Sequence, residues 1–374
     1  MKIYIKTFGC QMNKHDSEAV LGLLMNHGYE LTEDRKNADV FLVNTCSVRK
    51  HAEDKVYSML GELRKFKKKN KHDSVVGVMG CMAQKDKNEI FRRSPNVDFV
   101  CGTHNFHKIP EIIESVIKEK TKIAITDMGK QVFISPTLSS RENKSSAWVS
   151  IMKGCDNFCS YCIVPYVRGR EVSRPSRDIL QEVEELAHAG YKEITLLGQN
   201  VNSYGKGLSK KIDFSDLLEL VHKIKGIERI QFVTSHPKDI SLKLIDAVAN
   251  LEKVSRYLHF PLQSGSDKIL RLMNRGYTLS HYIEIVNRLR ERIPGIRLGT
   301  DIIVGFPKED EEDFEQTYQV MKDVEFNHAY MFKYSPREGT SAFKLKDDVP
   351  EQVKKDRLNK IINLQSSMGK KKEN

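Results

Sequence analysis

The sequence predicts an α/β protein with an N-terminal open parallel-sheet domain followed by a partial (β/α)6 barrel. Short apolar runs alternate with amphipathic helical segments along the chain, a polar stretch divides this alternation into two blocks, and cysteines follow the runs of the first block at regular spacing. Alternating strand and helix favours parallel strands joined by right-handed crossovers. The chain of 374 residues is also too long for one ordinary core.

The first block, residues 1–125, is expected to form the open sheet. Its strand candidates are the apolar runs at residues 2–8, 39–43, 74–79 and 97–100. Apolar residues recur at helical spacing over residues 18–27 and about 50–67. Each helical segment follows a strand candidate, so the strands are predicted to point the same way and to end at one edge of the sheet.

A cysteine ends each of the first three strand candidates. Cys10, Cys46 and Cys81 are 36 and 35 residues apart, which is one β-α unit each. Because open α/β sheets bind ligands at the carboxyl ends of their strands, the three thiols are predicted to converge there. Cys101 ends the fourth candidate strand, where it is either a fourth ligand or a buried, inert thiol.

Residues 126–146 are polar, have no sustained apolar period and are predicted to link the two blocks. The alternation resumes in residues 147–374, with strand candidates at 148–152, 193–197, 229–234, 257–262, 297–304 and 329–334. Helical segments lie between them at 176–188, 214–223, 242–250, 280–292 and 312–323, and a basic helix and tail are expected at the end. Such a barrel carries its chemistry in the loops that follow the strands.

A dense cysteine run follows the first strand candidate of this second block. Cys155, Cys159 and Cys162 form a C-x-x-x-C-x-x-C pattern. Four-iron clusters normally take four thiolates, and structural zinc sites take four closed ligands. This run offers three, with no further cysteine or well-spaced histidine close behind it. It therefore indicates a metal centre with one open coordination position.

Charge and compartment narrow the function classes. No apolar run approaches the roughly 18 residues that cross a bilayer, and the charged start of the chain lacks the apolar core of a signal peptide, so a cytoplasmic protein with metal-binding rather than disulfide-bonded cysteines is expected. The net charge of +11 favours a polyanionic partner. Basic residues cluster at 64–71 and 351–374, although a charge run is most often a solvated face. Arg168, Arg170 and Arg174, which lie just beyond the last of the cysteines, are expected to be better placed than these clusters to meet a phosphate of such a partner.

The sequence resembles the radical S-adenosylmethionine superfamily, whose hallmark is C-x-x-x-C-x-x-C with an aromatic residue, here Tyr161, before the last cysteine. Within it, the sequence is similar to the methylthiotransferases, and most to the MiaB-like enzymes that modify tRNA. The segments that carry this resemblance are residues 7–13, 43–49, 80–81, 154–166, 168–171, 197–205, 234–237, 261–266 and 301–307. Family members usually continue into a small RNA-binding TRAM domain, which is expected to be absent here because the sequence stops at Asn374.

The resemblance implies two [4Fe-4S] clusters and S-adenosylmethionine as cofactors. The implied ligands are Cys155, Cys159 and Cys162 for the catalytic cluster that cleaves S-adenosylmethionine, and Cys10, Cys46 and Cys81 for a second cluster that carries the sulfur to be inserted. A second S-adenosylmethionine would supply the methyl group. The expected product is a methylthio group on carbon 2 of a prenylated adenosine next to the tRNA anticodon.

Further cofactor contacts are expected at the mouth of the barrel. The turn at residues 198–200 occupies the position where the superfamily usually binds the amino group of the cofactor. Residues after the fourth strand and around the fifth are candidates for contacts to its ribose or adenine. The candidates are Tyr161, Gly198, Gln199, Asn200, Gln263, Ser264, Asp301 and Gly305. Packing and turn geometry are the alternative explanation for each of them except Tyr161.

The resemblance also implies partners, and it leaves alternatives open. A tRNA substrate, an electron donor such as a flavodoxin or ferredoxin, and a sulfur donor are expected, whereas a membrane or DNA is not. Sister branches act on threonylcarbamoyl-adenosine in tRNA or on an aspartate of a ribosomal protein. A non-enzymatic RNA-binding protein that holds iron–sulfur clusters or zinc is the third class.

Overall fold

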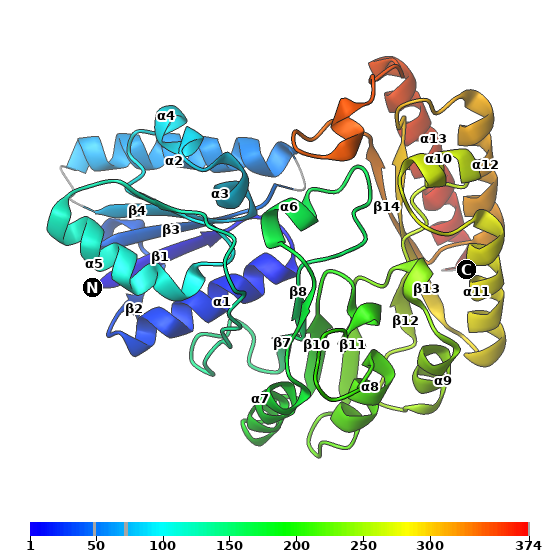
Figure 1. Cartoon of the computed structure of the whole chain (residues 1–374), viewed down its shortest axis with the longest axis horizontal. Coiled ribbons are helices and arrows are strands. Elements are labelled where there is room, and N and C mark those ends of the chain that lie inside the picture. The colour runs from blue at the N-terminus through cyan, green and yellow to red at the C-terminus, as the bar shows by residue number, and fades with distance from the viewer. Residues whose placement is uncertain (48–49, 71–73, 373–374) are drawn as a thin grey trace. The chain divides into compact units, whose positions relative to one another are not determined.

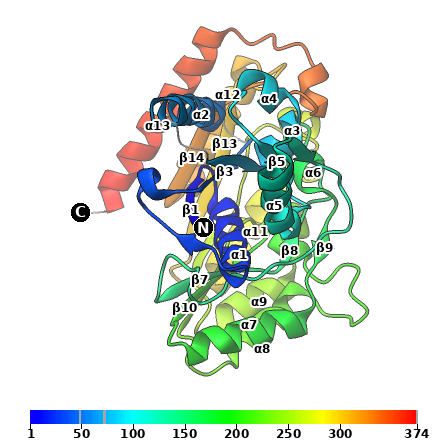
Figure 2. The same cartoon turned by 90° about the vertical axis from the view of Figure 1, so that its left-hand side faces the viewer.

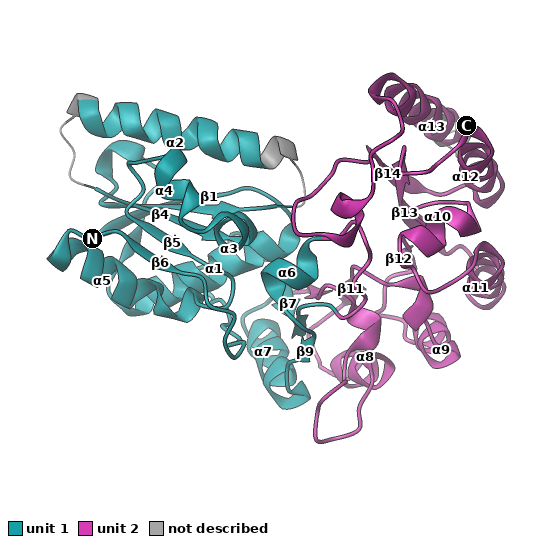
Figure 3. Cartoon of the chain, turned by 45° about the horizontal axis from the view of Figure 1, so that its top comes forward, with its two compact units in different colours: residues 1–155, 163–191 teal, residues 156–162, 192–374 magenta. Residues whose placement is uncertain are grey.

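The computed structural model describes residues 1–47, 50–70 and 74–372. Val48 and Arg49 of one motif, Lys71 of the basic run and the last two residues of the tail lie outside this range. The chain forms two compact units, residues 1–155 with 163–191 and residues 156–162 with 192–374 (Figure 3). The first unit therefore includes the first strand and first long helix of the second block.

The first unit contains the predicted parallel sheet, with strand order β2-β1-β3-β4-β5-β6. Its strands are β1 (Lys2–Thr7), β2 (Glu30–Leu31), β3 (Val40–Thr45), β4 (Val75–Gly80), β5 (Phe99–Cys101) and β6 (Ile123–Ile125). Every neighbouring pair is parallel. The helices are α1 (Gln11–Asn26), α2 (Lys50–Asn70), α3 (Cys81–Asp86), α4 (Glu89–Arg93) and α5 (Ile109–Glu119).

Helices cover both faces of this sheet, which explains why its central strands are continuous apolar runs. Along β3, Val40 and Leu42 pack with α1 and α5, whereas Phe41 and Val43 pack with α2. Figure 1 shows α2 on one side of the sheet and α1 and α5 on the other, and Figure 2 gives the view along the strands. Alternate side chains of one strand thus supply two cores.

The structure differs from the sequence prediction at the start of α1 and at the sheet edges. The helix begins at Gln11, not near residue 18, and its first turns bury Asn13, His15 and Asp16. Buried polar side chains give no apolar period, so this part of the helix was invisible in the pattern. The edge strands β2 and β6 have two and three residues, too few to show a period of two.

The six strands predicted for the second block are all present within three residues of their expected ends. They are β7 (Ser146–Ser150), β10 (Glu193–Leu197), β11 (Arg229–Phe232), β12 (Tyr257–His259), β13 (Arg297–Val304) and β14 (His328–Lys333). The helices are α6 (Val164–Arg168), α7 (Ser176–His188), α8 (Phe214–His222), α9 (Leu242–Asn250), α10 (Asp267–Leu272), α11 (Leu279–Arg292), α12 (Glu311–Val324) and α13 (Glu351–Lys372). Short 3-10 helices lie at Arg35–Asn37, Phe106–Lys108, Val201–Ser203, Pro237–Asp239 and Ser341–Lys344.

Within the second unit, β10 pairs with β11 and β13 pairs with both β12 and β14, all in parallel. Side-chain caps begin its helices: Ser241 caps α9, Thr278 caps α11, and Asp310 forms a capping box with Asp313 at the start of α12. Among the described helices, none is both long and apolar enough to cross a membrane. The connections between strand and helix in this unit carry most of the predicted cofactor contacts.

Candidate functional site

The three cysteines of the first unit lie at neighbouring strand ends. Cys10 is the N-cap of α1, Cys46 directly follows β3, and Cys81 is the first residue of α3 after β4. The register aligns Thr7 with Asn44 and Thr45 with Gly80, so these strand ends are level with one another. Topology therefore gathers the three thiols at one edge of the sheet.

Two glycines allow the strand ends to approach this closely. Gly9 has a φ of +130°, and a Cβ added there would lie 2.7 Å from the Cβ of Cys46. Gly80 has a φ of +101°, and its added Cβ would lie 2.4 Å from Asn44 Oδ1 and 2.6 Å from Thr45 O. A glycine precedes each of Cys10 and Cys81 because any other residue at these positions would be strained and would clash with the Cys46 loop.

Asn13 ties two of the cysteine loops together. Its Nδ2 donates to Thr45 O at 2.9 Å and to Phe8 O at 3.3 Å, while its Oδ1 accepts a hydrogen bond of 3.3 Å from Cys10 Sγ. Asn44 Nδ2 returns a bond of 2.7 Å to Asn13 O. Asn13 was not among the predicted site residues, and the signal for it was a polar residue one turn after the cysteine that begins a helix.

Burial and the charges of the neighbouring thiols act on Cys81. Burial raises the pKa of Cys81 to about 12, Arg168 opposes this shift, and the charges of Cys46 and Cys10 add to it. The charges of the three cysteine side chains thus act on one another. Among the described residues, no group of three Cys, His, Asp or Glu side chains is arranged to hold a single metal ion. A four-iron cluster has a different requirement, one thiolate for each of three separate irons, and the donor set of three cysteines fits that requirement.

Cys101 occupies the apolar core beneath this edge. It is fully buried in the cluster that includes Ile3, Leu42 and Phe106, and its sulfur lies 3.6 Å from Gly102 O. Burial raises its pKa far above the usual value, and the charge that acts on it is that of Lys108, not another thiol. These contacts are those of the buried, inert thiol and not of a fourth ligand.

Arg168 and Arg174 do not face an RNA phosphate, contrary to the sequence prediction. Arg168 is 5% exposed, and its Nη2 lies 2.7 Å from Asp16 Oδ2. Arg174 is 6% exposed, with its Nη1 2.5 Å from Glu182 Oε2 and 3.2 Å from Ser150 O. Only Arg170 of the three is exposed. A basic sequence motif reveals the charges but not the buried carboxylates that neutralise them.

The first cysteine of the C-x-x-x-C-x-x-C loop, Cys155, belongs to the first unit. The base of the loop is closed by an antiparallel pair of short strands, β8 (Met152–Lys153) and β9 (Val172–Ser173). Cys155 N donates to Gly169 O at 3.2 Å. Gly154 has a φ of +78°, and a Cβ there would lie 2.0 Å from Arg170 O. This close return of the chain fixes where the cysteine loop starts.

In the second unit, Arg275 holds the second cysteine of the run. Its Nη1 donates to Cys159 Sγ and to Tyr161 Oη, each at 3.3 Å, and its Nη2 donates to Pro261 O at 3.1 Å. His236 Nε2 lies 3.9 Å from the same sulfur. Burial and the nearby Arg275 charge lower the pKa of His236 to about 2, so this imidazole is neutral. Sequence reasoning missed Arg275, which stands in no motif that ligates metal.

The turn after β10 is partly structural. Gly198 is buried and Gln199 half-buried. Asn200 is buried, and its side chain joins two neighbours: Nδ2 donates to Asp239 Oδ2 at 2.7 Å, and Oδ1 accepts from His236 N at 3.2 Å. Asn200 therefore fixes the position of His236 beside Cys159.

The remaining candidates lie after β12, within β13 and directly after β13. Gln263 has a φ of +73°, and its Oε1 is buried without a hydrogen-bond partner among the described residues. Asp301 Oδ2 lies 3.2 Å from His259 Nε2 and keeps 27% of its side chain exposed. Ser264 is fully buried, with its Oγ 3.3 Å from Thr317 Oγ1. Gly305 has a φ of +69°, and an added Cβ would lie 2.3 Å from Cγ of Lys354.

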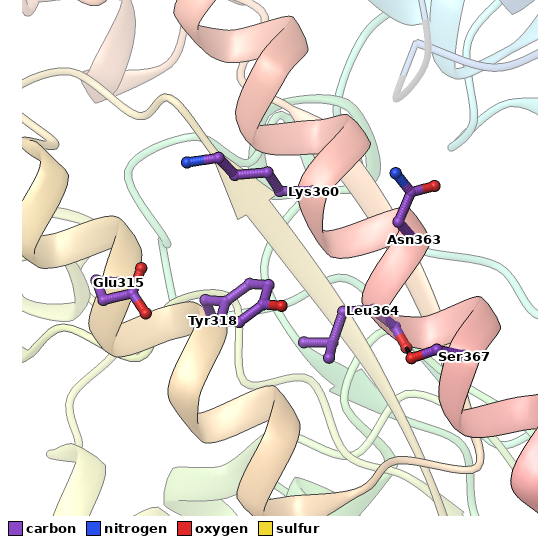
Figure 4. A pocket seen from close by; sticks show the side chains of 6 residues that line it. All are labelled: Glu315, Tyr318, Lys360, Asn363, Leu364 and Ser367. Atoms are coloured by element: carbon purple, nitrogen blue, oxygen red, sulfur yellow. Dashed lines mark hydrogen bonds between the residues drawn. The ribbon is translucent and has the colours of Figure 1, made fainter.

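A cavity of about 500 Å³ lies elsewhere in the second unit, between α12 and α13. Figure 4 shows its lining, which is Glu315, Tyr318, Lys360, Asn363, Leu364 and Ser367. None of the predicted site residues borders it. This cavity is therefore separate from both cysteine sets.

Two family models match most of the chain. The model of the uncharacterized protein family UPF0004 matches residues 2–102, which hold Cys10, Cys46, Cys81 and Cys101. The model of the Radical SAM superfamily matches residues 149–321, which begin just before the C-x-x-x-C-x-x-C loop. Each family model therefore covers one of the two cysteine sets.

Similar curated proteins share nearly the full chain. A protein of Protochlamydia amoebophila (strain UWE25) named tRNA-2-methylthio-N(6)-dimethylallyladenosine synthase is 47% identical over 368 residues, which cover 98% of this chain and 81% of the relative. The protein of the same name from Clostridium novyi (strain NT) is 51% identical over 364 residues, with coverages of 96% and 80%.

Solved structures share the fold at much lower identity. The radical S-adenosylmethionine methyltransferase TsrM from Kitasatospora setae, with cobalamin and a [4Fe-4S] cluster bound, matches with a TM-score of 0.64 at 13% identity, covering 91% of this chain and 73% of that one. At that identity the likeness shows the fold alone. Taken with the two family models and the curated relatives, it places the chain in the radical S-adenosylmethionine superfamily, and within it the chain belongs to the family of tRNA-2-methylthio-N(6)-dimethylallyladenosine synthases.

Proposed function

We propose that this protein is a methylthiotransferase that inserts sulfur and a methyl group at carbon 2 of a prenylated adenosine next to the tRNA anticodon. The observation that carries this proposal is that the chain holds a separate set of three thiols in the first unit. Cys155, Cys159 and Cys162 suffice for a radical S-adenosylmethionine enzyme, yet the first unit gathers three more cysteines at one sheet edge with Gly9, Gly80 and Asn13. Curated relatives that match 96% to 98% of this chain carry the name of the reaction.

Each cysteine set has a separate task in this proposal. A [4Fe-4S] cluster at each would supply an electron for cleavage of S-adenosylmethionine at the second set and the sulfur at the first. The chain's own residues position these groups. Arg275 directs its charge to Cys159, the neutral His236 lies beside the same sulfur, and Asn13 orients Cys10.

The contacts to S-adenosylmethionine belong to the proposal as well. Gln263 supports one of them, because a buried amide oxygen without a partner among the described residues has hydrogen-bonding capacity left. Asp301 supports another through its partly exposed carboxylate. Tyr161, Gly198 and Gln199 complete the expected lining. We assign Asn200, Ser264 and Gly305 to positioning, since their contacts are with Asp239, Thr317 and Lys354.

We also propose the domain division 1–125, 126–146 and 147–374 as the functional one. The family matches at residues 2–102 and 149–321 support it, although residues 147–155 and 163–191 pack with the first unit. The expected partners are tRNA, an electron donor such as a flavodoxin or ferredoxin, and a sulfur donor, in the cytoplasm. The exposed side chains of Arg64, Lys65 and Lys68 on α2 support a polyanionic partner.

The experiment is anaerobic reconstitution with iron and sulfide, followed by incubation with S-adenosylmethionine, a reductant and tRNA that carries the prenyl group without the methylthio group. Mass spectrometry of the nucleosides and of 5′-deoxyadenosine measures the reaction. We expect Cys159→Ala to abolish 5′-deoxyadenosine, and Cys46→Ala to retain it while losing methylthiolation.

The alternatives give different outcomes in the same assay. Methylthiolation of tRNA with threonylcarbamoyl-adenosine, but not of the prenylated tRNA, would contradict the proposed substrate. A protein that forms no 5′-deoxyadenosine with two intact clusters would contradict the enzymatic assignment.

A further inference from the structure

Arg168 lies beside the thiol set of the first unit, although its sequence position follows the other cysteine run. Its Nη2 donates to Asn13 Oδ1 at 3.2 Å, and Cys10 Sγ donates to the same oxygen at 3.3 Å. The preceding residue, Val167, packs in one buried cluster with Cys81 and Ile163. The Arg168 guanidinium and the Cys10 thiol therefore share Asn13 Oδ1 as their acceptor. The helix that carries Arg168, α6, packs on Cys81.

The backbone that carries Arg168 is held from outside its own helix. Thr103 Oγ1 donates to Val167 O at 2.5 Å, and Arg168 O lies 3.2 Å from His104 Nε2 and 2.9 Å from Gln131 Nε2. None of these bonds involves the guanidinium. A substitution of the Arg168 side chain therefore leaves the clamp on α6 in place.

The guanidinium of Arg168 contacts both a carboxylate and the residue that binds the Cys10 thiol. Asp16 Oδ2 pairs with Arg168 Nη2 at 2.7 Å, both side chains being at most 6% exposed. The same Nη2 also donates to Asn13 Oδ1, which accepts from Cys10 Sγ, so the guanidinium is linked to the thiol set as well as to the carboxylate. A set of three thiolates is strongly anionic, and a cation fixed in a low-dielectric surrounding acts on it with little screening.

We propose that Arg168 is a positioning residue for the first cysteine set: its fixed positive charge stabilises the anionic ligands and raises the reduction potential of the cluster they hold, and Asp16 limits this effect. The inference rests on the proposed function, in which Cys10, Cys46 and Cys81 bind a cluster. The two members of the buried ion pair thus have opposite effects on the reduction potential: Arg168 raises it and Asp16 lowers it.

The test uses the full chain with Cys155, Cys159 and Cys162 replaced by Ala, so that only the first set binds iron. Iron and sulfide content and the midpoint potential, followed by electron paramagnetic resonance during a redox titration, are measured without any turnover. We expect Arg168→Gln to shift the potential to more negative values, Arg168→Lys to restore part of the shift, and Asp16→Asn to shift it to more positive values.

Arg174→Gln is the matched control, because it also removes a buried arginine of the same unit from an ion pair, here with Glu182. It is expected to leave the potential unchanged.

A purely structural role would lower iron content in all variants without shifts of opposite sign, and this result would overturn the inference, as would equal potentials throughout. If Arg168→Gln binds no iron, Arg168→Lys and Asp16→Asn still decide by the sign of their shifts. A parent protein that takes up no iron would overturn the proposed function together with the inference.

Discussion

At the scale of single residues, Arg275 places a positive charge beside Cys159. Its bonds to Cys159 Sγ and Tyr161 Oη are charge-assisted, and such bonds are roughly twice as strong as neutral ones. Arg275→Gln should therefore slow 5′-deoxyadenosine formation by at least about tenfold, the equivalent of about 1.4 kcal/mol. The rate is to be normalised to iron content. Arg292→Gln, which removes an exposed arginine of the same unit from its ion pair with Asp246, serves as the control, and an unchanged normalised rate in Arg275→Gln would refute the role.

Cys101, in contrast, is expected to be a buried thiol that does not ligate a cluster. Its contacts are with apolar core residues and its own neighbouring carbonyl. Cys101→Ala should keep full iron content and methylthiolation, with a loss of about 1 kcal/mol in the free energy of unfolding from the trimmed thiol. Iron analysis and thermal unfolding measure both. Loss of the first cluster in this single variant would mean that four cysteines ligate it.

At the scale of elements, the turn from β4 to α3 places Cys81 through a glycine. Gly80→Ala would bring a Cβ within 2.4 Å of Asn44 Oδ1 at a φ of +101°. We expect a loss of more than about 2 kcal/mol in stability and reduced iron binding at the first set. Gly28→Ala is the matched control, since Gly28 has a φ of +80° but no atom within 4 Å of an added Cβ. Equal effects of the two substitutions in unfolding and iron assays would show that strain alone, and not the clash, matters.

At the scale of the whole molecule, one buried ion pair makes stability depend on pH. Glu309 accepts hydrogen bonds from Gly305 N at 2.6 Å and Arg357 Nη1 at 2.9 Å, joining the turn after β13 to α13. Burial raises the pKa of Glu309 to about 7 in spite of Arg357. The folded state thus holds a proton that the unfolded state releases near pH 4.5, so this group's stabilisation is present at low pH and lost between about pH 4.5 and 7.

Glu309→Gln should remove this dependence. The shift in pKa corresponds to up to about 3 kcal/mol, so the stability of the variant relative to the natural protein should improve between pH 5 and pH 7.5. Thermal unfolding of both proteins is measured at the two pH values. Comparing the change with pH in the variant with the change in the natural protein cancels the pH-independent cost of removing the Glu309 carboxylate from Arg357. A relative stability that stays constant or falls would contradict the raised pKa.

The sequence by itself determined the alternating strands and helices, the strand-end positions of Cys10, Cys46 and Cys81, and the family. Periodicity and spacing are local properties of a chain, and parallel topology then brings successive strand ends to one edge. Only the tertiary structure decided the roles of Asn13, Arg168 and Arg275. These side chains are polar and buried, so they leave no apolar period, and their partners lie far away in sequence. Arg168 was expected to meet RNA because its charge is visible in the sequence, whereas the compensating Asp16 is brought to it only by folding.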